Sequence, residues 1–288
     1  MNQLEPVVTI GIPTFKRPDL LDQTLNHIFL QTYKNIKVII SNNEADLNLI
    51  MPTVNKYKKL LDLDFCHQEK NIGLVNNFLF LLEKANSEYF MYLADDDEIS
   101  DNFVESLVTD LNNNTQAVCV VPYWNQSASE NTNIEKIPSH FPSKNIFLRV
   151  IRYVWKSDDA FHYGLHRLKY LKNCKYISFW WPNRDSVPNW AYPYLFSLII
   201  QGPIILTANP KCIWYQKTYT KKLYRGHEDR FSKKNKFGTL LNLLVFTCKR
   251  MNVYLLYIYK IFLHKKFFLL PIVIVVAFFA LLRDIYEN

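Results

Sequence analysis

The chain is poor in glycine and has no closely spaced cysteines. Six glycines in 288 residues exclude collagen-like and glycine-rich low-complexity sequence. The five cysteines are widely separated and form no CxxC pair, which argues against a disulfide framework or a zinc site and indicates reduced, cytosolic thiols. Residues 1–6 lack the basic and apolar stretches of a secretory signal, so we expect no signal peptide.

The composition is that of a folded protein. Hydrophobic residues make up 49% and charged residues 21% of the chain, which is enough apolar sequence to bury a core and excludes an intrinsically disordered protein. A length of 288 residues fits one large domain or two fused halves. The high aromatic content, 15%, suits a core, a sugar-binding surface or a membrane interface.

Positive charge is concentrated near the C-terminus. The chain has a net charge of +8, but residues 216–266 hold 13 Lys and Arg against only Glu228 and Asp229. The preceding 215 residues are therefore slightly acidic. Basicity is a property of the tail and not of the body of the protein.

Strand-like and helix-like segments alternate over the first 121 residues. Short β-branched or apolar runs predict strands, and apolar residues at helical spacing between them predict helices. This order predicts an α/β fold with a mostly parallel sheet covered by helices on both faces. Ligands then bind beyond the carboxyl ends of the strands. The predicted strands lie at 7–13, 36–40, 63–67, 89–94 and 117–121, with a further one at 204–207.

An acidic run, Asp95-Asp96-Asp97-Glu98, ends the strand predicted at 89–94. Four adjacent carboxylates repel one another, and a hard divalent cation such as Mg²⁺ or Mn²⁺ would offset that repulsion. The alternative is an acidic helix start, since carboxylates favour a helix N-terminus. Ser100 and Asp101 already supply a cap before the next helix, so we favour a metal site.

Three further polar loops follow predicted strands. They are Gly11–Pro18, Ser41–Glu44 and Asn71–Asn77. Each one alone is also compatible with an ordinary turn or a helix cap. Together with the acidic run, however, all four lie at the carboxyl ends of predicted parallel strands, so they are expected to converge on one cleft.

At these residues the chain resembles a family 2 glycosyltransferase of the GT-A fold. The resemblance covers roughly residues 5–121 and implies inverting transfer from a nucleotide-activated sugar, most often a uridine diphosphate (UDP) sugar. It is carried by Ile10–Arg17, Ser41-Asn42-Asn43, Asn71-Ile72-Gly73 with Asn77, and Tyr92–Asp97.

The resemblance also implies roles for individual residues. Asp95 and Asp97 would form a D-x-D motif that binds Mn²⁺ or Mg²⁺, with Asp96 as another carboxylate at the donor. Asn43 stands where the family usually has an acidic residue. The residues expected to contact the nucleotide sugar are Pro13, Thr14, Phe15, Arg17, Asn43, Asn71, Gly73 and Asn77.

Inverting transfer requires a carboxylate base in the second half of the domain. The family places it roughly 90 residues after the D-x-D motif, which makes Asp185 the first candidate and Asp158 and Asp159 the alternatives. Farther on, a Tyr-Arg-x-His stretch implies that Arg225 contacts the diphosphate and that His227 is a further metal ligand, unless the segment is a solvated basic linker.

Two histidines share a helical spacing outside these motifs. His162 and His166 are four residues apart, which permits metal binding, but the sequence offers no third ligand. Their segment resembles a Tyr-Gly-x-x-Arg stretch that lines the acceptor side of the family's site. Trp180, Trp181 and Trp190 would stack either on a sugar or, more often for tryptophan, in the core.

The C-terminal segment combines the basic run with apolar sequence. Residues 267–282 contain no charge, and as a helix they would extend about 24 Å, slightly short of a bilayer core. This segment would dip into a membrane, span a thinned one, or pack on the domain. The uncharged run argues against nucleic acid as a partner. We expect contact with the cytoplasmic face of an inner membrane and a lipid-linked acceptor.

These observations give three regions and one leading function. We expect residues 1–121 to bind the nucleotide sugar, residues 122–215 to bind the acceptor, and residues 216–288 to form a helical, membrane-associated tail. The leading function is a hexosyltransferase of bacterial surface polysaccharide, lipopolysaccharide or glycoprotein glycan synthesis. The alternatives are a GT-A-like membrane-tethered partner that binds nucleotide sugar without transferring it and, less favoured, a metal-dependent phosphohydrolase.

Overall fold

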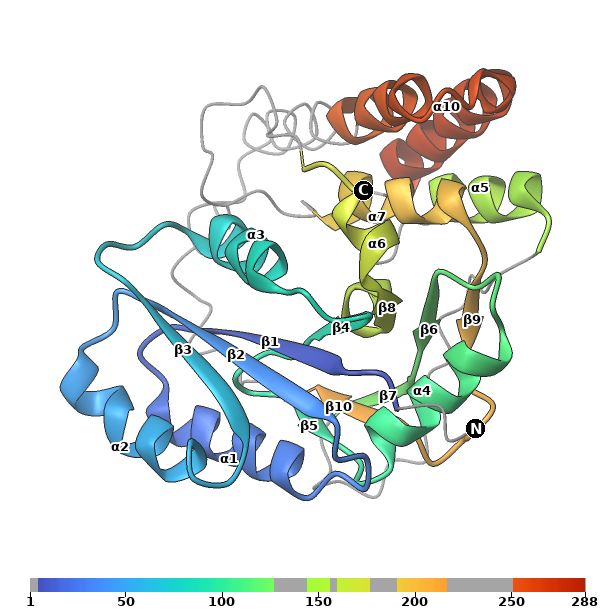
Figure 1. Ribbon diagram of the computed structural model, residues 1–288. Helices are drawn as coiled ribbons and strands as arrows, with labels where there is room; N and C mark the ends of the chain where they lie inside the picture. Colours follow the sequence, from blue (N-terminus) through green and yellow to red (C-terminus); the bar gives the residue numbers. More distant parts are fainter. Residues whose placement is uncertain (1–4, 127–143, 156–159, 177–190, 217–250, 288) are drawn as a thin grey trace.

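The protein folds around a mixed β-sheet with helices on both faces (Figure 1). The computed structural model describes residues 5–126, 144–155, 160–176, 191–216 and 251–287. The strands are β1 (Val8–Thr14), β2 (Ile36–Asn43), β3 (Asp62–Gln68), β4 (Tyr89–Tyr92), β5 (Glu98–Ile99), β6 (Cys119–Val121), β7 (Tyr123–Gln126), β8 (Leu165–Arg167), β9 (Ile204–Leu206) and β10 (Ile213–Gln216). The helices are α1 (Pro18–Phe29), α2 (Leu47–Tyr57), α3 (Leu74–Lys84), α4 (Phe103–Asn113), α5 (Ile146–Trp155), α6 (Leu168–Lys172), α7 (Ala191–Gln201), a helix over 251–263, and α10 (Leu270–Glu287), with short 3-10 turns at Ala160–Tyr163 and Phe267–Leu269.

The central sheet confirms the expected architecture. Seven strands lie in the order β3-β2-β1-β4-β8-β6-β9, and β3, β2, β1 and β4 are all parallel neighbours. The predicted runs at 7–13, 36–40, 63–67 and 89–94 coincide with these four strands. Their carboxyl ends therefore meet at one edge of the sheet, as the sequence predicts.

One strand departs from the parallel pattern. β8 runs antiparallel between β4 and β6, and its His166 lies opposite Phe90 on one side and Cys119 on the other. Gly164 precedes it, and a Cβ atom at that position would lie 2.6 Å from the Val120 carbonyl oxygen. A side chain at residue 164 would therefore prevent β8 from approaching β6.

Two hydrophobic cores lie on opposite faces of the sheet. In one, Ile10 and Ile12 of β1 pack with Leu21 and Leu25 of α1 and with residues of α2 and α4. In the other, alternate β4 residues such as Phe90 pack with α3, α5 and α7. Because the central strands are buried on both faces, they appear in the sequence as short, mostly apolar runs and not as a strict alternation of polar and apolar residues.

Helix α1 shows why these segments fold as predicted. Pro18 occupies the first turn, where a proline costs no hydrogen bond. Leu21, Leu25 and Ile28 recur at helical spacing and are all buried against the sheet. The amphipathic pattern thus fixes which face of the helix contacts the core.

A second, three-stranded sheet orders β5-β10-β7 and lies beside the acidic run. β10 pairs with β5 so that Trp214 is opposite Ile99. β10 also pairs in parallel with β7. This small sheet brings residues more than a hundred positions apart together at the end of β4.

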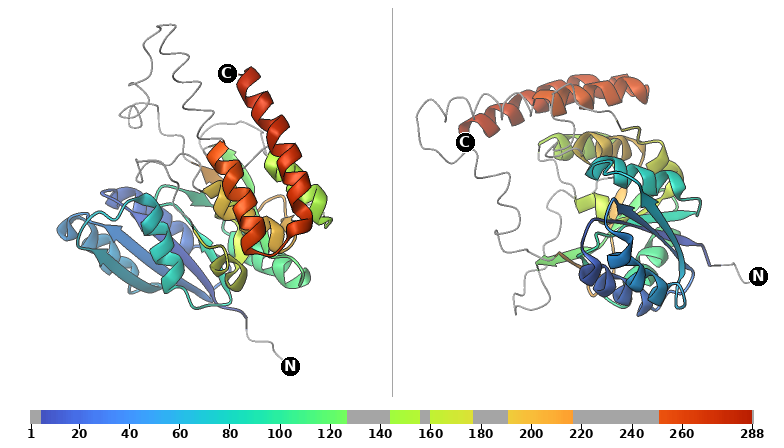
Figure 2. Two further views of the ribbon diagram at one scale, coloured as in Figure 1. Left: turned by 90° about the horizontal axis from the view of Figure 1, so that it is seen from above. Right: turned by 90° about the vertical axis from the view of Figure 1, so that its left-hand side faces the viewer.

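The C-terminal residues form a pair of helices joined by a tight turn, which we call the C-terminal hairpin (residues 251–283). The views in Figures 1 and 2 place it against α5 and α7, on the side of the molecule away from α1 and α2. Its Tyr257, Ile261 and Val273 belong to the same core as α5 and α7. Within the part of the chain that the structure describes, none of the helices has the length and apolarity needed to cross a membrane.

Candidate functional site

The acidic run forms a tight turn at the carboxyl end of β4. The backbone N–H of Leu93 donates to the carbonyl of Gly11, which keeps the end of β4 beside β1, and the N–H of Asp97 donates to the carbonyl of Ala94. Asp95 is fully buried and Asp97 nearly so, whereas Asp96 is partly exposed. The turn thus directs two carboxylates inward at the edge where the parallel strands end.

Residues at the end of β1 and in the loop that follows it hold two of these carboxylates. The hydroxyl of Thr14 donates a 2.7 Å hydrogen bond to Asp95 Oδ2. The guanidinium of Arg17 forms ion pairs with Asp95 Oδ1 at 2.5 Å and with Asp96 Oδ2 at 2.7 Å. Lys16 has a left-handed backbone (φ 59°) and so makes the turn that precedes Arg17. Arg17 therefore spans two acids of the run.

Asp97 has a different environment. Its Oδ2 atom is buried and accepts no hydrogen bond among the described residues. The pKa of Asp97 is raised to about 8, chiefly by burial and then by the charge of Asp96, while the indole of Trp214 opposes the rise. At neutral pH this carboxyl group is largely protonated until a cation or donor approaches.

Asp95 is perturbed less than Asp97, although it is equally deep. Burial raises the pKa of Asp95 to about 6, and the nearby Arg17 charge and the Thr14 hydrogen bond limit that rise. The two acids of the D-x-D motif are thus distinguished by their partners. Asp95 is ionised and ion-paired near neutral pH, while Asp97 retains an available oxygen.

The loops after β2 and β3 meet through a network of side-chain amides. Asn43 accepts a hydrogen bond from the backbone N–H of Ile72 and donates one to Asn71 Oδ1 at 3.1 Å. Asn71 Oδ1 also accepts from the N–H of Gly73, whose φ of 80° begins α3. A carboxylate at position 43 would repel Asn71 Oδ1, so this network explains the amide where the resemblance expects an acid.

Two of the residues expected to contact the nucleotide sugar are buried beneath this loop and do not lie on its surface. Asn77 is buried and exchanges hydrogen bonds with the Ser41 hydroxyl and carbonyl, which fixes α3 to β2. Pro13 is buried within β1, opposite Ser41. Phe15, in contrast, is exposed beside Lys16, whose ammonium lies 4.8 Å from the ring centroid.

The candidates downstream of the acidic turn fall outside the described residues. This applies to the proposed base Asp185, to its alternatives Asp158 and Asp159, and to Arg225 and His227. The same is true of Trp180, Trp181 and Trp190.

The two spaced histidines are core residues. His162 and His166 are buried, and burial lowers their pKa values to about 3 and about 4, so both are neutral. The His162 ring stacks on Tyr92 with the centroids 4.4 Å apart. His162 therefore packs against β4 in the core of the protein. Within the described residues, no three His, Cys, Asp or Glu side chains converge as ligands of one metal ion.

Sequence reasoning missed the contribution of β10 to this site. The ring of Tyr163 stacks on Trp214 at 4.5 Å, and Trp214 in turn lies beside Asp97. The four-residue strand Ile213–Gln216 gives a weak sequence signal because it is short. The tryptophan in this strand is the residue that could have indicated the contribution. Its aromatic side chain closes one side of the acidic turn.

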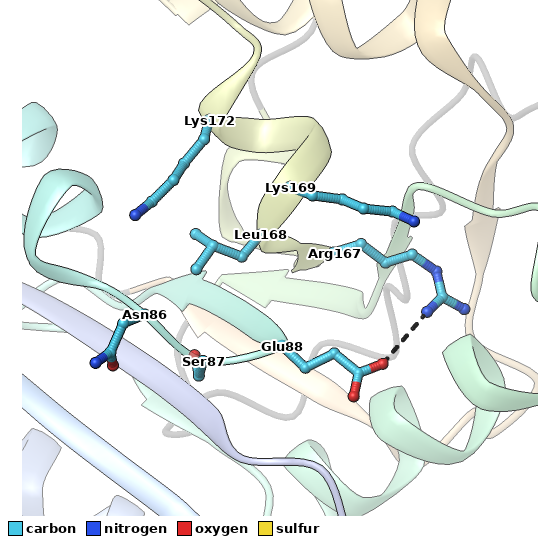
Figure 3. Close-up of a pocket in the computed structure, with 7 residues that line it drawn as sticks. All are labelled: Asn86, Ser87, Glu88, Arg167, Leu168, Lys169 and Lys172. Carbon is cyan, nitrogen blue, oxygen red and sulfur yellow. Dashed lines mark ion pairs between the residues drawn. The ribbon is translucent and has the colours of Figure 1, made fainter.

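A surface cavity of about 370 Å³ lies at the opposite end of β4 (Figure 3). Arg167 and Glu88 approach to 3.8 Å across it. Arg167 also donates hydrogen bonds to the carbonyls of Ala117 and Leu111 and to the Tyr89 hydroxyl. Because Arg167 binds so many neighbours, it joins β8 to β4 and α4, and the cavity lies far from the carboxylates in the fold.

Comparison with known proteins agrees with this geometry. The model of the family described as glycosyl transferase family 2 matches residues 9–187. A glucosyltransferase of Campylobacter jejuni that acts on GalNAc(5)-diNAcBac-PP-undecaprenol is 27% identical over 109 residues, which cover 37% of this chain and 35% of that protein. An uncharacterised glycosyltransferase of Haemophilus influenzae is 24% identical over 120 residues, 41% of this chain and 36% of that protein. The matches thus span little more than a third of these relatives.

Solved structures show the same fold. S. aureus TarS 1–349 in complex with UDP-GlcNAc superposes with a TM-score of 0.61 at 13% identity, over 91% of this chain and 73% of that chain. The UDP complex of the same protein gives a TM-score of 0.61 over 88% of this chain and 65% of that one. Since the family model also covers more than half of the sequence, the chain belongs to glycosyl transferase family 2.

Proposed function

We propose that the protein transfers a sugar from a nucleoside diphosphate sugar, a UDP-sugar, to a hydroxyl group of a glycan acceptor with inversion at the anomeric carbon. The observation that carries this proposal is the convergence of Thr14, Arg17 and the acidic turn at the carboxyl ends of β1 and β4. The UDP-GlcNAc complex of the S. aureus structure with the same fold supports a uridine donor.

The loops around the turn provide a site for the nucleotide. Phe15 exposes an aromatic face to stack on a base, and the Asn43–Asn71 network places amide groups at the end of the adjacent strand. Pro13, Gly73 and Asn77 contribute by shaping the backbone that carries these groups. In this proposal the nucleobase of the donor lies between the loops after β1 and β2.

The acidic turn offers a divalent cation one available ligand. Asp97 Oδ2 is a buried oxygen without a hydrogen-bond partner among the described residues, which is the kind of ligand that Mg²⁺ and Mn²⁺ take. Asp95 and Asp96 are the neighbouring carboxylates. A bound cation would supply charge neutralisation to the leaving diphosphate. We propose His227 as a further ligand.

Arg17 has a positioning role in this proposal. Its guanidinium holds Asp95 and Asp96 in one orientation, and the same planar group binds phosphate oxygens in the same forked manner. The charge of Arg17 balances that of the acidic turn. We propose that Arg17 lies between the carboxylates and the diphosphate when the donor is bound, and that Arg225 is a further contact of the diphosphate.

The acceptor hydroxyl has to lose its proton while it attacks the face of the sugar opposite to the leaving group. We propose Asp185 as the carboxylate that takes this proton, with Asp158 and Asp159 as the alternatives. Residues 122–215 would then carry the acceptor. A lipid-linked oligosaccharide is the acceptor class we propose, because the C. jejuni relative is named for an undecaprenol-linked substrate.

One observation favours a second candidate, a protein that binds nucleotide sugar without transferring it. Arg17 already occupies two of the three consecutive aspartates, which leaves Asp97 as the available oxygen. A protein of this kind would bind the donor and fail to turn it over. The two functions therefore differ in turnover and not in binding.

Calorimetric titration of UDP, GDP and dTDP with and without Mn²⁺ tests the donor site. We expect one nucleotide, UDP, to bind in a Mn²⁺-dependent way to the wild type and to Asp64→Ala, a matched control whose acid lies on β3 and pairs with Lys37. Asp97→Ala should lose that dependence. Absence of binding to any nucleotide by the folded protein would contradict the proposal.

Turnover separates the two candidate functions. With UDP-sugars and a lipid-linked oligosaccharide fraction, Asp185→Asn should retain UDP binding but lose at least about a hundredfold in transfer rate. The same substitution at Asp158 and Asp159 shows whether either alternative is the base. Donor binding by the wild type with no transfer to any acceptor would favour the non-transferring protein.

A further inference from the structure

The C-terminal hairpin is apolar on two opposite sides. On the inner side, Tyr257, Ile261, Val273 and Ala277 are buried in the core that includes α5 and α7. The inner side therefore accounts for only part of the apolar sequence. A helix that is apolar all round is expected to be covered on all sides, so its outer side needs an explanation.

Large apolar side chains form a continuous stripe along the outer side. They recur every three or four residues on both helices, which places them on one face of each. The edge-to-face pair Phe262–Phe267 joins the two helices at the turn, with ring centroids 5.3 Å apart. The side chains of the stripe, each 47–58% exposed, are Met251, Leu255, Tyr259 and Phe262 on the first helix, Phe267 and Phe268 at the turn, and Ile274, Val275, Phe278, Phe279 and Leu282 on α10.

Helix α5 continues the stripe. Its Phe147 is exposed and contacts Phe268 edge to face, with ring centroids 5.7 Å apart. At the other end of α5, the exposed Trp155 lies under the guanidinium of Arg283, which also donates a hydrogen bond to the Trp155 carbonyl. The hairpin and α5 thus present one apolar surface, which we call the outer hairpin face. Isolated exposed apolar residues are common, but a continuous stripe of this extent marks an interaction site.

The charged side chains within residues 144–155 and 251–283 have one sign, and acids follow only at the end of α10, at Asp284 and Glu287. Neither residues 144–155 nor residues 251–283 contain an Asp or Glu. Arg152 on α5 and Lys265 at the hairpin turn are exposed, and Lys266, which follows Lys265, is partly exposed. In the sequence alone, residues 217–250 hold ten Lys and Arg against two acids. An apolar stripe edged by basic residues is complementary to a surface that is apolar inside and anionic at its rim.

We propose that the outer hairpin face docks on a lipid bilayer with anionic headgroups. Both helices lie along the bilayer surface, because the inner side of each is already packed on the domain. Aromatic rings enter the boundary between headgroups and acyl chains, and the cations at the hairpin turn contact the headgroups. This inference goes beyond the proposed function, since it depends on neither donor nor metal.

A second copy of the chain is a poorer occupant of this surface. In a two-fold symmetric dimer the same patch occurs on both subunits, so the basic residues of one copy would approach those of the other. The described part of the patch offers no acidic side chain to offset that repulsion. An anionic bilayer satisfies both the apolar stripe and the cations.

Vesicle flotation with the full chain tests the proposal. Two kinds of vesicle are used, phosphatidylcholine alone and phosphatidylcholine with phosphatidylglycerol in a two-to-one mixture. We expect the wild type to bind the anionic vesicles. The double substitution Phe278→Gln/Phe279→Gln should weaken that binding at least about tenfold, because two exposed rings no longer enter the boundary.

The matched control is Leu47→Gln/Leu49→Gln, which changes two exposed apolar residues of α2 on the far side of the molecule (Figure 1). It should bind as the wild type does. Lys265→Asn/Lys266→Gln should weaken binding to anionic vesicles only, and added salt should have the same effect. Circular dichroism melting of every variant verifies that each one is folded.

Three results would overturn the inference. They are a wild type that binds neither vesicle, a phenylalanine variant that binds as well as the wild type, and an equal loss in the α2 control. Light scattering tests whether a second copy of the chain, and not a bilayer, binds the outer hairpin face. A concentration-dependent dimer that is abolished by Phe278→Gln/Phe279→Gln, without vesicle binding, would assign the surface to a second copy and reject the bilayer.

Discussion

The acidic turn and the outer hairpin face are opposites in what they expose. At the turn, Asp95 and Asp97 place carboxylates inside the protein, where water cannot solvate them. On the hairpin, Phe278 and Phe279 place aromatic rings outside the protein, where water solvates them poorly. The acidic turn buries charged groups, and the outer hairpin face exposes large apolar ones. In each region several neighbouring residues share this unusual placement.

Both regions contain groups that lower the stability of the fold where they stand, and such groups indicate a functional role. Residues that serve only the fold should destabilise it when they are changed. Residues retained for binding should leave stability unchanged, or raise it, when they are replaced by groups that suit their surroundings. The two regions can therefore be tested by the same unfolding measurements, from the largest expected effect to the smallest.

The largest effect is expected inside the hairpin. Ile261→Ala should lower the free energy of unfolding by about 2–5 kcal/mol, because Ile261 is fully buried and its loss leaves a cavity. Leu255→Ala, on the outer side of the same helix, should change it by less than about 0.5 kcal/mol. Urea denaturation followed by tryptophan fluorescence measures both. Equal costs would mean that the hairpin has no inner and outer side.

The next effect concerns the charge balance of the turn. Arg17→Ala should lower the free energy of unfolding by about 2–3 kcal/mol, because it leaves the fully buried Asp95 without its ion-pair partner. The range is reduced from that of a fully buried pair because Arg17 itself is 38% exposed. Adding Asp95→Asn to Arg17→Ala should recover part of the loss.

The control for this prediction is an ion pair on the surface. Lys56 and Asp22 approach to 2.8 Å with both side chains exposed. Lys56→Ala should therefore cost less than about 1 kcal/mol. If Lys56→Ala costs as much as Arg17→Ala, the burial of Asp95 has no special energetic meaning.

Asp97 gives a pH-dependent effect of intermediate size. Its pKa is about 8 in the folded protein against 3.8 as the reference, so the folded state retains a proton that the unfolded state releases between these pH values. The contribution of Asp97 to stability is therefore full at low pH, falls as the pH rises through this window, and levels off above pH 8.

Asp97→Asn removes this dependence. The variant should be more stable than the wild type at pH 8 by about 1–3 kcal/mol without metal, and the difference should shrink toward acidic pH. Thermal unfolding at several pH values, with a chelator present, measures it. Addition of Mn²⁺ should stabilise only the wild type. A wild type whose advantage grows with pH would show that Asp97 is ionised in the folded protein.

The smallest effect is expected for the outer side of the hairpin. Phe278→Gln/Phe279→Gln should change the free energy of unfolding by no more than about 0.5 kcal/mol, because both rings are exposed and glutamine is a good helix former. Chemical denaturation of the lipid-free protein measures it. A loss above 2 kcal/mol would place these rings in the fold and not on a binding surface.

The sheet and the acidic turn could be predicted from the sequence because they depend on local signals. β1, β2 and β4 are buried on both faces and so give short, mostly apolar runs, and the acidic run follows β4 directly. Their convergence needs only the rule that parallel strands end at the same edge.

The partners of those residues could not be predicted, because they come from distant parts of the chain. β8 has three residues and no visible alternation, so its place between β4 and β6 depends on pairing on both sides. Trp214 reaches Asp97 from a four-residue strand. The difference between Asp95, which is ion-paired, and Asp97, which is not, likewise depends on where Arg17 lies in space.

The orientation of the hairpin was also beyond the sequence. Residues 267–282 are apolar on every side of a helix, so periodicity does not distinguish a buried face from an exposed one. The alternative of packing on the domain is what the inner side does. Only the contacts with α5 and α7 show which residues remain outside.

The antiparallel strand β8 has a consequence for the order in which the chain folds. Its partners β4 and β6 lie earlier in the sequence, and β8 joins them only after residue 167 has been made. During synthesis β1, β2 and β3 can pair early, whereas β4 presents an open edge until β8 arrives. The long sequence separation of these pairings favours their formation after the local pairing of β1, β2 and β3. Because β8 joins β4 to β6 and β9, a substitution at Gly164 that displaces it would leave the first four strands folded with an unpaired edge at β4.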